Sequence, residues 1–105
     1  MKRAFSDWTK WTDRAALADL GYPGVYALAI SPAELSAMPF SWRLEIVYVG
    51  MTNAKGGLKS RLQQFDNTIK GGDGHGGGHR VRFKHSDYHE LTSHLFVSVC
   101  PWECD

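Results

Sequence analysis

The segment KGGDGHGGGH, residues 70–79, combines glycines with side chains that can bind a metal ion or a phosphate. Six of its ten residues are glycine, and Asp73, His75 and His79 lie among them. Successive glycine N–H groups can wrap a phosphate, and aspartate and histidine can coordinate a metal. The segment lacks the G-x-x-x-x-G-K-[ST] order of a P-loop, so nucleotide hydrolysis of that type is not expected. Because ordering so many glycines costs conformational entropy, we expect a mobile surface loop rather than a metal site.

Positive charge is concentrated around this segment. Residues 55–85 carry seven Lys or Arg side chains and two acidic ones, a net charge of +5, within a chain whose overall formal charge is +1. Residues 1–54 are balanced, and residues 86–105 carry four acidic side chains and no Lys or Arg. A local excess of this size suits an anionic partner such as a nucleic-acid backbone. The alternative, that these charges spread over different faces after folding, stays open.

Four stretches of regular hydrophobic pattern predict the elements that position these residues. VYALAI at 25–30 and RLEIVYVG at 43–50 are short and apolar, which is typical of strands. LKSRLQQFDNTI at 58–69 repeats apolar residues three or four positions apart, which predicts a helix. SHLFVSV at 93–99 is rich in Phe and Val and predicts a third strand. Each of these elements lies close to a charged or glycine-rich segment.

Three less regular stretches complete the chain. Thr12, the sequence DRAALADL and a closing glycine predict a short helix over 13–20. Residues 31–42 contain two prolines and are expected to be irregular, while HRVRFKH at 79–85 alternates basic and apolar residues, as a short strand or an extended loop would. The resulting order predicts a single α+β domain over 1–105, with a three-stranded, mostly antiparallel sheet flanked by helices.

Composition limits the compartment and the class of protein. A chain that is 43% hydrophobic and 22% charged is too apolar to be disordered. It has no apolar run near the ~20 residues of a membrane span and no signal-peptide core, so we expect a cytoplasmic protein without a membrane partner. Cys100 and Cys104 have a C-x-x-x-C spacing that matches neither a zinc knuckle nor a redox pair, and we expect two reduced thiols.

Two tripeptides and an arginine are arranged in an order that is typical of one nuclease family. Gly-Val-Tyr at 24–26 opens the first predicted strand, Tyr-Val-Gly at 48–50 closes the second, and Arg61 follows Gly50 by eleven residues on the predicted helix. This arrangement, including YVGMTNAKGGLKSRLQQF, resembles the GIY-YIG nuclease family over about residues 20–100. The resemblance implies a metal-dependent endonuclease that hydrolyses DNA phosphodiester bonds with magnesium or manganese.

The resemblance implies catalytic roles for Tyr26, Tyr48 and Arg61. Arginine presents a fixed fork of N–H groups to phosphate oxygens and keeps its charge. A tyrosine hydroxyl can orient or deprotonate the attacking water, provided that nearby cations lower its pKa from ~10. The resemblance favours Tyr26 as the base, with Tyr48 hydrogen-bonded to the reacting phosphate.

Further residues are expected to contact DNA. Gly50 would let the backbone pass close to the substrate, and Lys55 and Lys59 are candidates for phosphate contacts. His79 is the histidine that we select for testing, as a phosphate contact or a proton-transfer aid. The remaining expected DNA contacts are Arg80 and Arg82, which follow His79 in the basic segment.

One part of the family pattern is missing. The resemblance implies a metal-binding glutamate on a helix after the third strand, but Glu103 follows that strand too closely and Glu90 precedes it. The metal ligand is therefore unassigned. We expect either a domain that lacks its C-terminal helix or a domain of the same fold that binds nucleic acid without cutting it. A missing helix would expose apolar surface, which makes a homodimer an expectation.

A second alternative is an unrelated metal-binding or scaffold domain. It predicts zinc uptake through His75 and His79 and indifference to replacement of Arg61. The nuclease and the non-cutting DNA-binding domain both require Tyr26, Tyr48 and Arg61 to converge on one exposed face. DNA binding without metal-dependent nicking would favour the second of these two.

Overall fold

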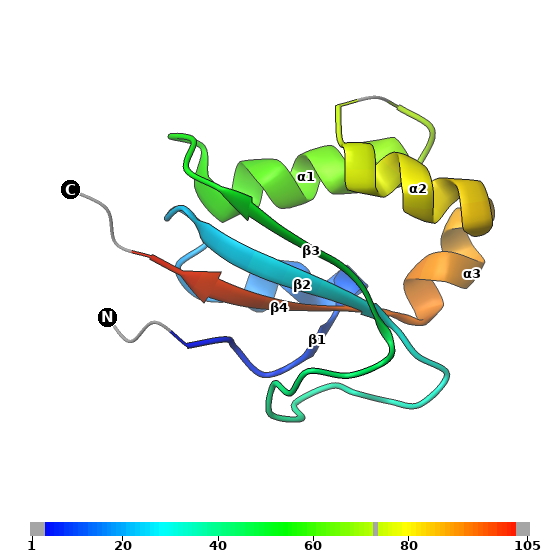
Figure 1. Ribbon diagram of the computed structural model, residues 1–105, viewed down its shortest axis with the longest axis horizontal. Coiled ribbons are helices and arrows are strands. Elements are labelled where there is room, and N and C mark those ends of the chain that lie inside the picture. Colours follow the sequence, from blue (N-terminus) through cyan, green and yellow to red (C-terminus); the bar gives the residue numbers. More distant parts are fainter. Residues whose placement is uncertain (1–3, 73, 103–105) are drawn as a thin grey trace.

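The computed structural model describes residues 4–72 and 74–102, which form a four-stranded sheet with helices (Figure 1). In chain order the elements are β1 (Thr9–Lys10), the 3₁₀-helix η1 (Trp11–Ala16), β2 (Gly24–Ile30), β3 (Ile46–Thr52), α1 (Gly57–Ile69), α2 (Gly76–Lys84), α3 (Tyr88–Ser93) and β4 (Leu95–Pro101). The sheet order is β1-β4-β2-β3, and every neighbouring pair is antiparallel. The predicted α+β class is confirmed, but the sheet has four strands rather than three. The fourth, β1, contains only two residues, too few to show an alternating pattern in the sequence.

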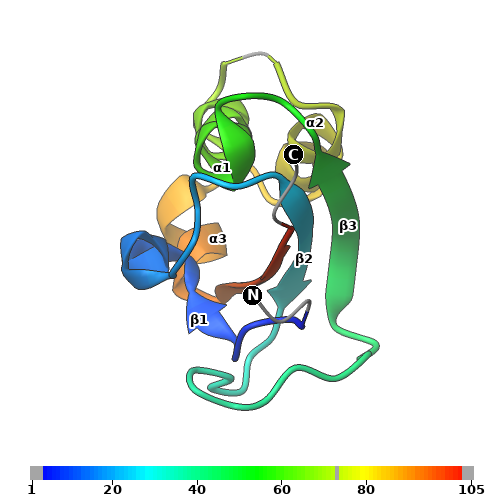
Figure 2. The same ribbon diagram turned by 90° about the vertical axis from the view of Figure 1, so that its left-hand side faces the viewer.

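The central strand β2 separates two faces of the sheet. Successive side chains of a strand point to opposite faces, so Tyr26 and Leu28 join the core under the helices while Ala27 and Ala29 join a second cluster on the other face. Helices α1 and α2 lie side by side over the first face, as Figure 2 shows. Residues from β2 therefore reach the helices only at every second position.

Helix α1 supplies the largest part of the helix-side core. Its residues Leu58, Leu62, Phe65 and Ile69 are all buried, in the spacing that predicts a helical face, so the expected helix over 58–69 is confirmed. Burying an aliphatic or aromatic side chain of this size contributes about 1.5–3 kcal/mol. This packing fixes α1 against the sheet and determines which of its side chains face the neighbouring strands.

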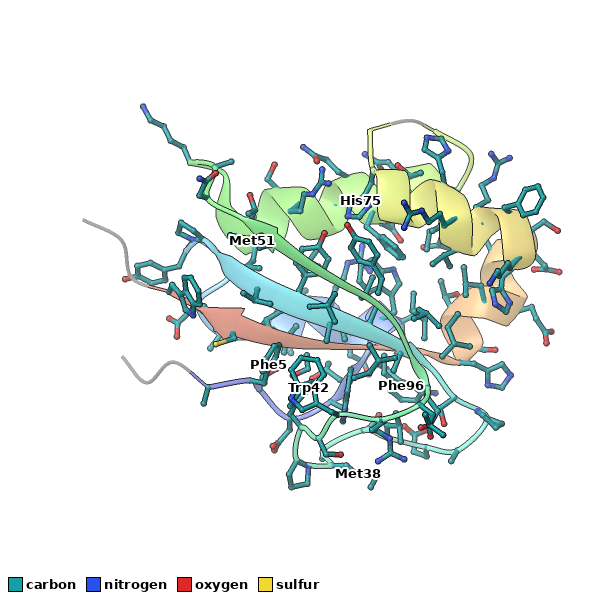
Figure 3. All side chains as sticks on the ribbon, viewed as in Figure 1. Phe5, Met38, Trp42, Met51, His75 and Phe96 are labelled. Carbon is teal, nitrogen blue, oxygen red and sulfur yellow. The ribbon has the colours of Figure 1, made fainter. Side chains whose placement is uncertain are left out.

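The opposite face is covered without a helix. The N-terminal segment and the irregular connection between β2 and β3 place Trp8, Leu35 and Phe40 against this side of the sheet. Figure 3 shows Phe5, Trp42 and Phe96 on this side and His75 on the helix side. The irregular segment predicted for 31–42 therefore has a structural use, since it closes the second core.

The predicted helix over 13–20 is wrong. The chain instead forms the short 3₁₀-helix η1 and becomes extended at Leu17. The reason lies in α1, whose first N–H groups have no partners within their own helix. The backbone N–H of Leu58 donates to Tyr22 O at 2.9 Å, and that of Lys59 donates to Leu20 O at 2.8 Å. The segment before β2 therefore caps a helix that is distant in the sequence and does not continue its own.

The predictions for residues 76–85 are also wrong. HRVRFKH is neither a strand nor an extended loop, because α2 runs from Gly76 to Lys84 and includes the last three glycines of the glycine-rich segment. The nitrogen Nδ1 of His75 accepts a hydrogen bond from the N–H of Gly78 at 3.0 Å and so caps this helix. Helix α3 was not predicted, and Asp87 caps it by accepting a hydrogen bond from the N–H of Glu90 at 3.1 Å.

The expectations about a membrane span and about the cysteines can be compared with the structure. Within residues 4–72 and 74–102, no helix has the length and apolar character needed to cross a membrane. Cys100 is a free, buried thiol on β4, and Cys104 lies outside the described residues.

Candidate functional site

The two tyrosines of the tripeptides lie on one face of the sheet, under the helices. The register between β2 and β3 sets Tyr26 opposite Gly50, two residues beyond Tyr48 on the same face. The ring centroids of Tyr26 and Tyr48 are 6.0 Å apart. A Cβ atom at Gly50 would lie 2.5 Å from Tyr26 Oη and 2.7 Å from Tyr48 Cε2. Gly50 therefore makes room for the two rings, an intramolecular reason for glycine that the sequence analysis did not foresee.

His75 is the partner of Tyr26. Its side chain is 1% exposed, and its Nε2 lies 2.6 Å from Tyr26 Oη. The imidazole packs edge-on against the rings of Tyr48 and Phe65, with centroid distances of 5.4 and 5.2 Å. Figure 3 shows His75 between the helices and the sheet. His75 thus connects the start of α2 to the tyrosine pair.

The hydrogen bonds of His75 determine its tautomer. Because Nδ1 accepts the N–H of Gly78, a neutral ring carries its proton on Nε2 and donates it to Tyr26 Oη. Burial, and then the charge of Arg61, lower the pKa of His75 to about 4, which keeps the imidazole neutral near pH 7. The hydroxyl proton of Tyr26 is consequently left for an acceptor other than His75.

The electrostatics of Tyr26 differ from the expectation for a base. Burial and then the neighbouring Tyr48 raise the pKa of Tyr26 to about 12, although Arg61 acts in the opposite direction. The condition for a base role, a pKa lowered by nearby cations, is therefore not met, because the desolvation of a phenolate outweighs the attraction of one nearby guanidinium. Tyr26 is fully buried, whereas Tyr48 and Arg61 are half-buried. Of these three residues, Tyr48 and Arg61 are the ones that a substrate can reach from solvent.

Arg61 lies on α1 beside an open groove of about 310 Å³, which it shares with the turn after β3. Its Nη1 donates to Gln64 Oε1 at 2.6 Å and to the carbonyl of Gly74 at 3.3 Å. The charge of Arg61 influences the pKa values of both Tyr26 and His75. The three residues that the resemblance implies are thus gathered where β2, β3, α1 and α2 meet.

The expected DNA-contacting side chains lie at several separate places on the molecule. His79 and Arg80 line the groove between α2 and β3, next to Tyr48. Lys55 is exposed in the turn between β3 and α1. Lys59 faces η1 on the other side of α1 from Arg61, because two residues of a helix span about 200°. A fourth basic side chain, Arg82, extends over Gly71, where a Cβ would lie 3.5 Å from its Nη2.

Sequence reasoning missed His75 as a site residue, because it treated this histidine only as a metal ligand and selected His79 for testing. A signal for its role is present in the next residues. Gly77, Gly78 and Val81 share one helical face, and all three are buried. A Cβ at Gly77 would lie 2.5 Å from Tyr48 Cε1, and one at Gly78 would lie 2.9 Å from Thr68 Cβ. Glycines at such spacing indicate a helix that approaches its neighbours closely.

The described residues contain no group of three or more His, Cys, Asp or Glu side chains that could hold a metal ion. Both ring nitrogens of His75 are hydrogen-bonded within the protein, which removes it from a zinc site with His79. Glu90 is exposed on α3, while Asp73 and Glu103 lie outside the described residues. A magnesium or manganese ligand set is therefore not assigned.

Comparisons of this chain with protein-family models, with curated proteins and with solved structures find no match.

Proposed function

We propose that Tyr48 and Arg61 bind a phosphodiester group of DNA, and that the chain provides the phosphate-binding part of a GIY-YIG-like endonuclease site. The observation that carries this proposal is the convergence of Tyr26, Tyr48 and Arg61 above one buried histidine. The resemblance in sequence order supports the assignment to nuclease chemistry. The local basic residues His79 and Arg80, beside Tyr48, support an anionic substrate.

Each side chain has a role in this proposal that follows from its protonation and exposure. Arg61 offers two parallel N–H donors to the non-bridging oxygens of a phosphate and stabilises the extra negative charge of the pentacovalent transition state. Tyr48, on the half-exposed side, donates its hydroxyl proton to a phosphate oxygen. Both contacts become stronger as charge develops on these oxygens, which is the requirement for accelerating a reaction.

Tyr26 and His75 act behind these two residues as positioning residues. The Nε2–H of His75 occupies one acceptor site of Tyr26 Oη, so the Tyr26 hydroxyl proton is donated to another acceptor. In this proposal that acceptor is the hydroxyl of Tyr48, whose ring packs against the ring of Tyr26. Tyr26 thereby orients the Tyr48 hydroxyl for donation. The pKa of Tyr26, about 12, disfavours the phenolate that a base role would need. Because burial is the main cause of this raised pKa, Tyr26 could act as a base only if its hydroxyl became exposed to solvent.

Metal chemistry is part of what the family resemblance implies, but no step is assigned to a metal ion here. The residues that line the groove at Arg61 include no carboxylate. The same observation favours the second candidate function, a nucleic-acid-binding domain of this fold that does not cut. The two functions share the phosphate contacts and differ only in bond cleavage.

Nicking of supercoiled plasmid in the presence of magnesium or manganese tests the proposal. Arg61→Ala is expected to reduce nicking by roughly 10²–10³-fold, as the loss of one transition-state donor does in other enzymes. Arg61→Lys keeps the charge but loses the fork and should recover only part of the activity. Arg43→Ala is the matched control, since this arginine is also half-buried and pairs with Glu45 away from the tyrosines.

The outcomes separate the two functions. Metal-dependent nicking that Arg61→Ala abolishes and Arg43→Ala preserves supports the nuclease. DNA binding that depends on Arg61 and Tyr48, without nicking, supports the binding domain. Nicking or binding that is indifferent to Arg61 would exclude both.

A further inference from the structure

A second groove, of about 650 Å³, lies between α2 and the edge strand β3. This volume is within the roughly 300–1,000 Å³ range of pockets that hold small ligands. Its floor is apolar and includes Ile46, Tyr48 and Val81, while Arg80 and Lys84 stand on its α2 side. No acidic side chain lines it. The groove therefore combines an apolar floor with a positively charged rim.

Tyr48 connects this groove to the phosphate site. Its ring lines the groove and also packs against Tyr26 and His75. Gly77 makes this arrangement possible, because a Cβ there would collide with Tyr48 Cε1 at 2.5 Å. A ligand in the groove would thus contact the same residue that donates to the phosphate beside Arg61.

Phe83 gives the rim an aromatic surface. Its side chain is 91% exposed although it lines the groove, and it follows Arg82 and precedes Lys84 on α2. An exposed phenylalanine between basic side chains offers a ring face for stacking next to charges that attract phosphates. Aromatic residues interleaved with basic ones are the arrangement by which proteins bind single-stranded nucleic acid.

We propose that this groove receives one unpaired nucleobase, adjacent to the phosphate bound by Tyr48 and Arg61. The base stacks on Phe83 above the apolar floor, and Arg80 and Lys84 contact the flanking phosphates. This inference rests on the proposed function and narrows its substrate class to DNA with an unpaired nucleotide next to the bound phosphodiester. An unpaired base is favoured because extracting a paired base from the duplex costs a few kcal/mol.

The groove proposal is tested by binding alone, without metal. Fluorescence anisotropy compares a short DNA duplex that carries one unpaired adenine with the matched, fully paired duplex. The unmodified chain is expected to prefer the first by roughly fivefold or more, and Phe83→Ala to weaken only that complex, by roughly 5- to 150-fold. Phe83→Leu should recover little, since it restores apolar area without a ring. Leu44→Ala is the matched control, because Leu44 is fully exposed and does not line either groove.

The charges of the rim have a different expected effect. Lys84→Ala should weaken the binding of both duplexes and reduce the salt slope by about one, because it removes one phosphate contact. Arg61→Ala should also weaken both duplexes. Only the ring of Phe83 is expected to separate paired from unpaired DNA.

The failure of this inference is distinct from the failure of the proposed function. Equal affinity for the two duplexes, or equal effects of Phe83→Ala and Leu44→Ala, would overturn the groove proposal while Arg61-dependent binding still stood. Affinity that does not respond to Arg61→Ala would overturn the phosphate site and the groove proposal together. A preference for the unpaired duplex that Phe83→Ala removes, with Arg61-dependent binding of both duplexes, supports both.

Discussion

Two buried polar clusters lie under the helices of this protein, and they are built in opposite ways. In the first, the carboxylate of Asp66 is 1% exposed and accepts hydrogen bonds from Trp11 Nε1 at 2.8 Å and Tyr88 Oη at 2.7 Å. It also pairs with Lys70 at 2.8 Å and with Arg14 at 3.4 Å. Burial raises the pKa of Asp66. The opposing effect of its four partners is larger in sum, so the pKa is lowered overall; these partners are Lys70, Trp11, Tyr88 and Arg14. This cluster is charged and fully partnered.

The second cluster is neutral. Burial raises the pKa of Tyr26 to about 12 and lowers that of His75 to about 4, so neither group carries a charge near pH 7. Its hydrogen bonds lead from the cap of α2 through His75 to Tyr26. The ring of Tyr26 in turn packs against the half-buried Tyr48. One cluster thus fastens η1, α1 and α3 together, while the other packs against Tyr48, where we propose that a phosphate binds. Both clusters are buried, and they differ in their charge and in whether they lie next to the proposed site.

The largest expected effect is on stability and comes from the charged cluster. Asp66→Ala should lower the free energy of unfolding by about 3 kcal/mol or more, because it leaves Trp11 Nε1 unpaired and two cations without their carboxylate. Urea unfolding followed by tryptophan fluorescence measures this change. Glu34→Ala, which removes an exposed ion pair with Lys10, is the control and should unfold like the unmodified chain. If Asp66→Ala and Glu34→Ala changed the free energy of unfolding by equally small amounts, the charged cluster would not have this stabilising role.

The neutral cluster predicts a pH dependence. The folded chain keeps His75 neutral down to about pH 4, whereas the unfolded chain protonates it near 6.5. The unfolded state therefore binds more protons between these values, and the contribution to stability is complete above pH 6.5 and is lost as the pH falls toward 4, by roughly 3 kcal/mol. His75→Asn should flatten this slope while it still caps α2 through Gly78. His89→Asn, on the exposed side of α3, should keep the slope; an unchanged slope in His75→Asn would contradict the assignment.

Two adjacent glycines of α2 test how closely this helix packs. Gly77→Ala should lower the free energy of unfolding by about 2 kcal/mol, since its Cβ would lie 2.5 Å from Tyr48 Cε1 and overpack the core. Gly76→Ala has no atom within 4 Å of its Cβ and should instead be neutral or stabilising by up to about 1 kcal/mol, because alanine favours helix. Thermal unfolding of the pair measures the difference, and equal melting temperatures would show that α2 does not rest on Tyr48.

The smallest effect compares one tyrosine hydroxyl from each region. Tyr88→Phe removes a hydrogen bond to the buried Asp66 and should cost about 1.5 kcal/mol of unfolding free energy. Tyr48→Phe should leave stability nearly unchanged and weaken DNA binding, since we propose that this hydroxyl donates to the bound phosphate. Measuring stability and DNA affinity in both variants sharpens the comparison. It fails if Tyr88→Phe, rather than Tyr48→Phe, selectively weakens DNA binding.

The parts of the fold that the sequence predicted are those whose pattern is local. The apolar stretches of β2, β3 and β4 and the spacing of Leu58, Leu62, Phe65 and Ile69 in α1 show their periodicity within a few residues. The family resemblance implied that Tyr26, Tyr48 and Arg61 share a site. In the structure Tyr26 packs against Tyr48, and Arg61 acts on its pKa, but Tyr26 is buried rather than exposed.

Tertiary structure alone decided the rest, because the determining partners are distant in the sequence. The helix expected over 13–20 gave way to a segment that caps α1. The last three glycines of the glycine-rich segment joined helix α2, in which Gly77 and Gly78 allow a close approach to β3 and α1. His75 changed from a candidate metal ligand to the neutral partner of Tyr26, since burial at the junction of α2 and the sheet set its protonation. Composition and spacing identify which groups can do chemistry, but packing decides which of them are buried, charged or exposed.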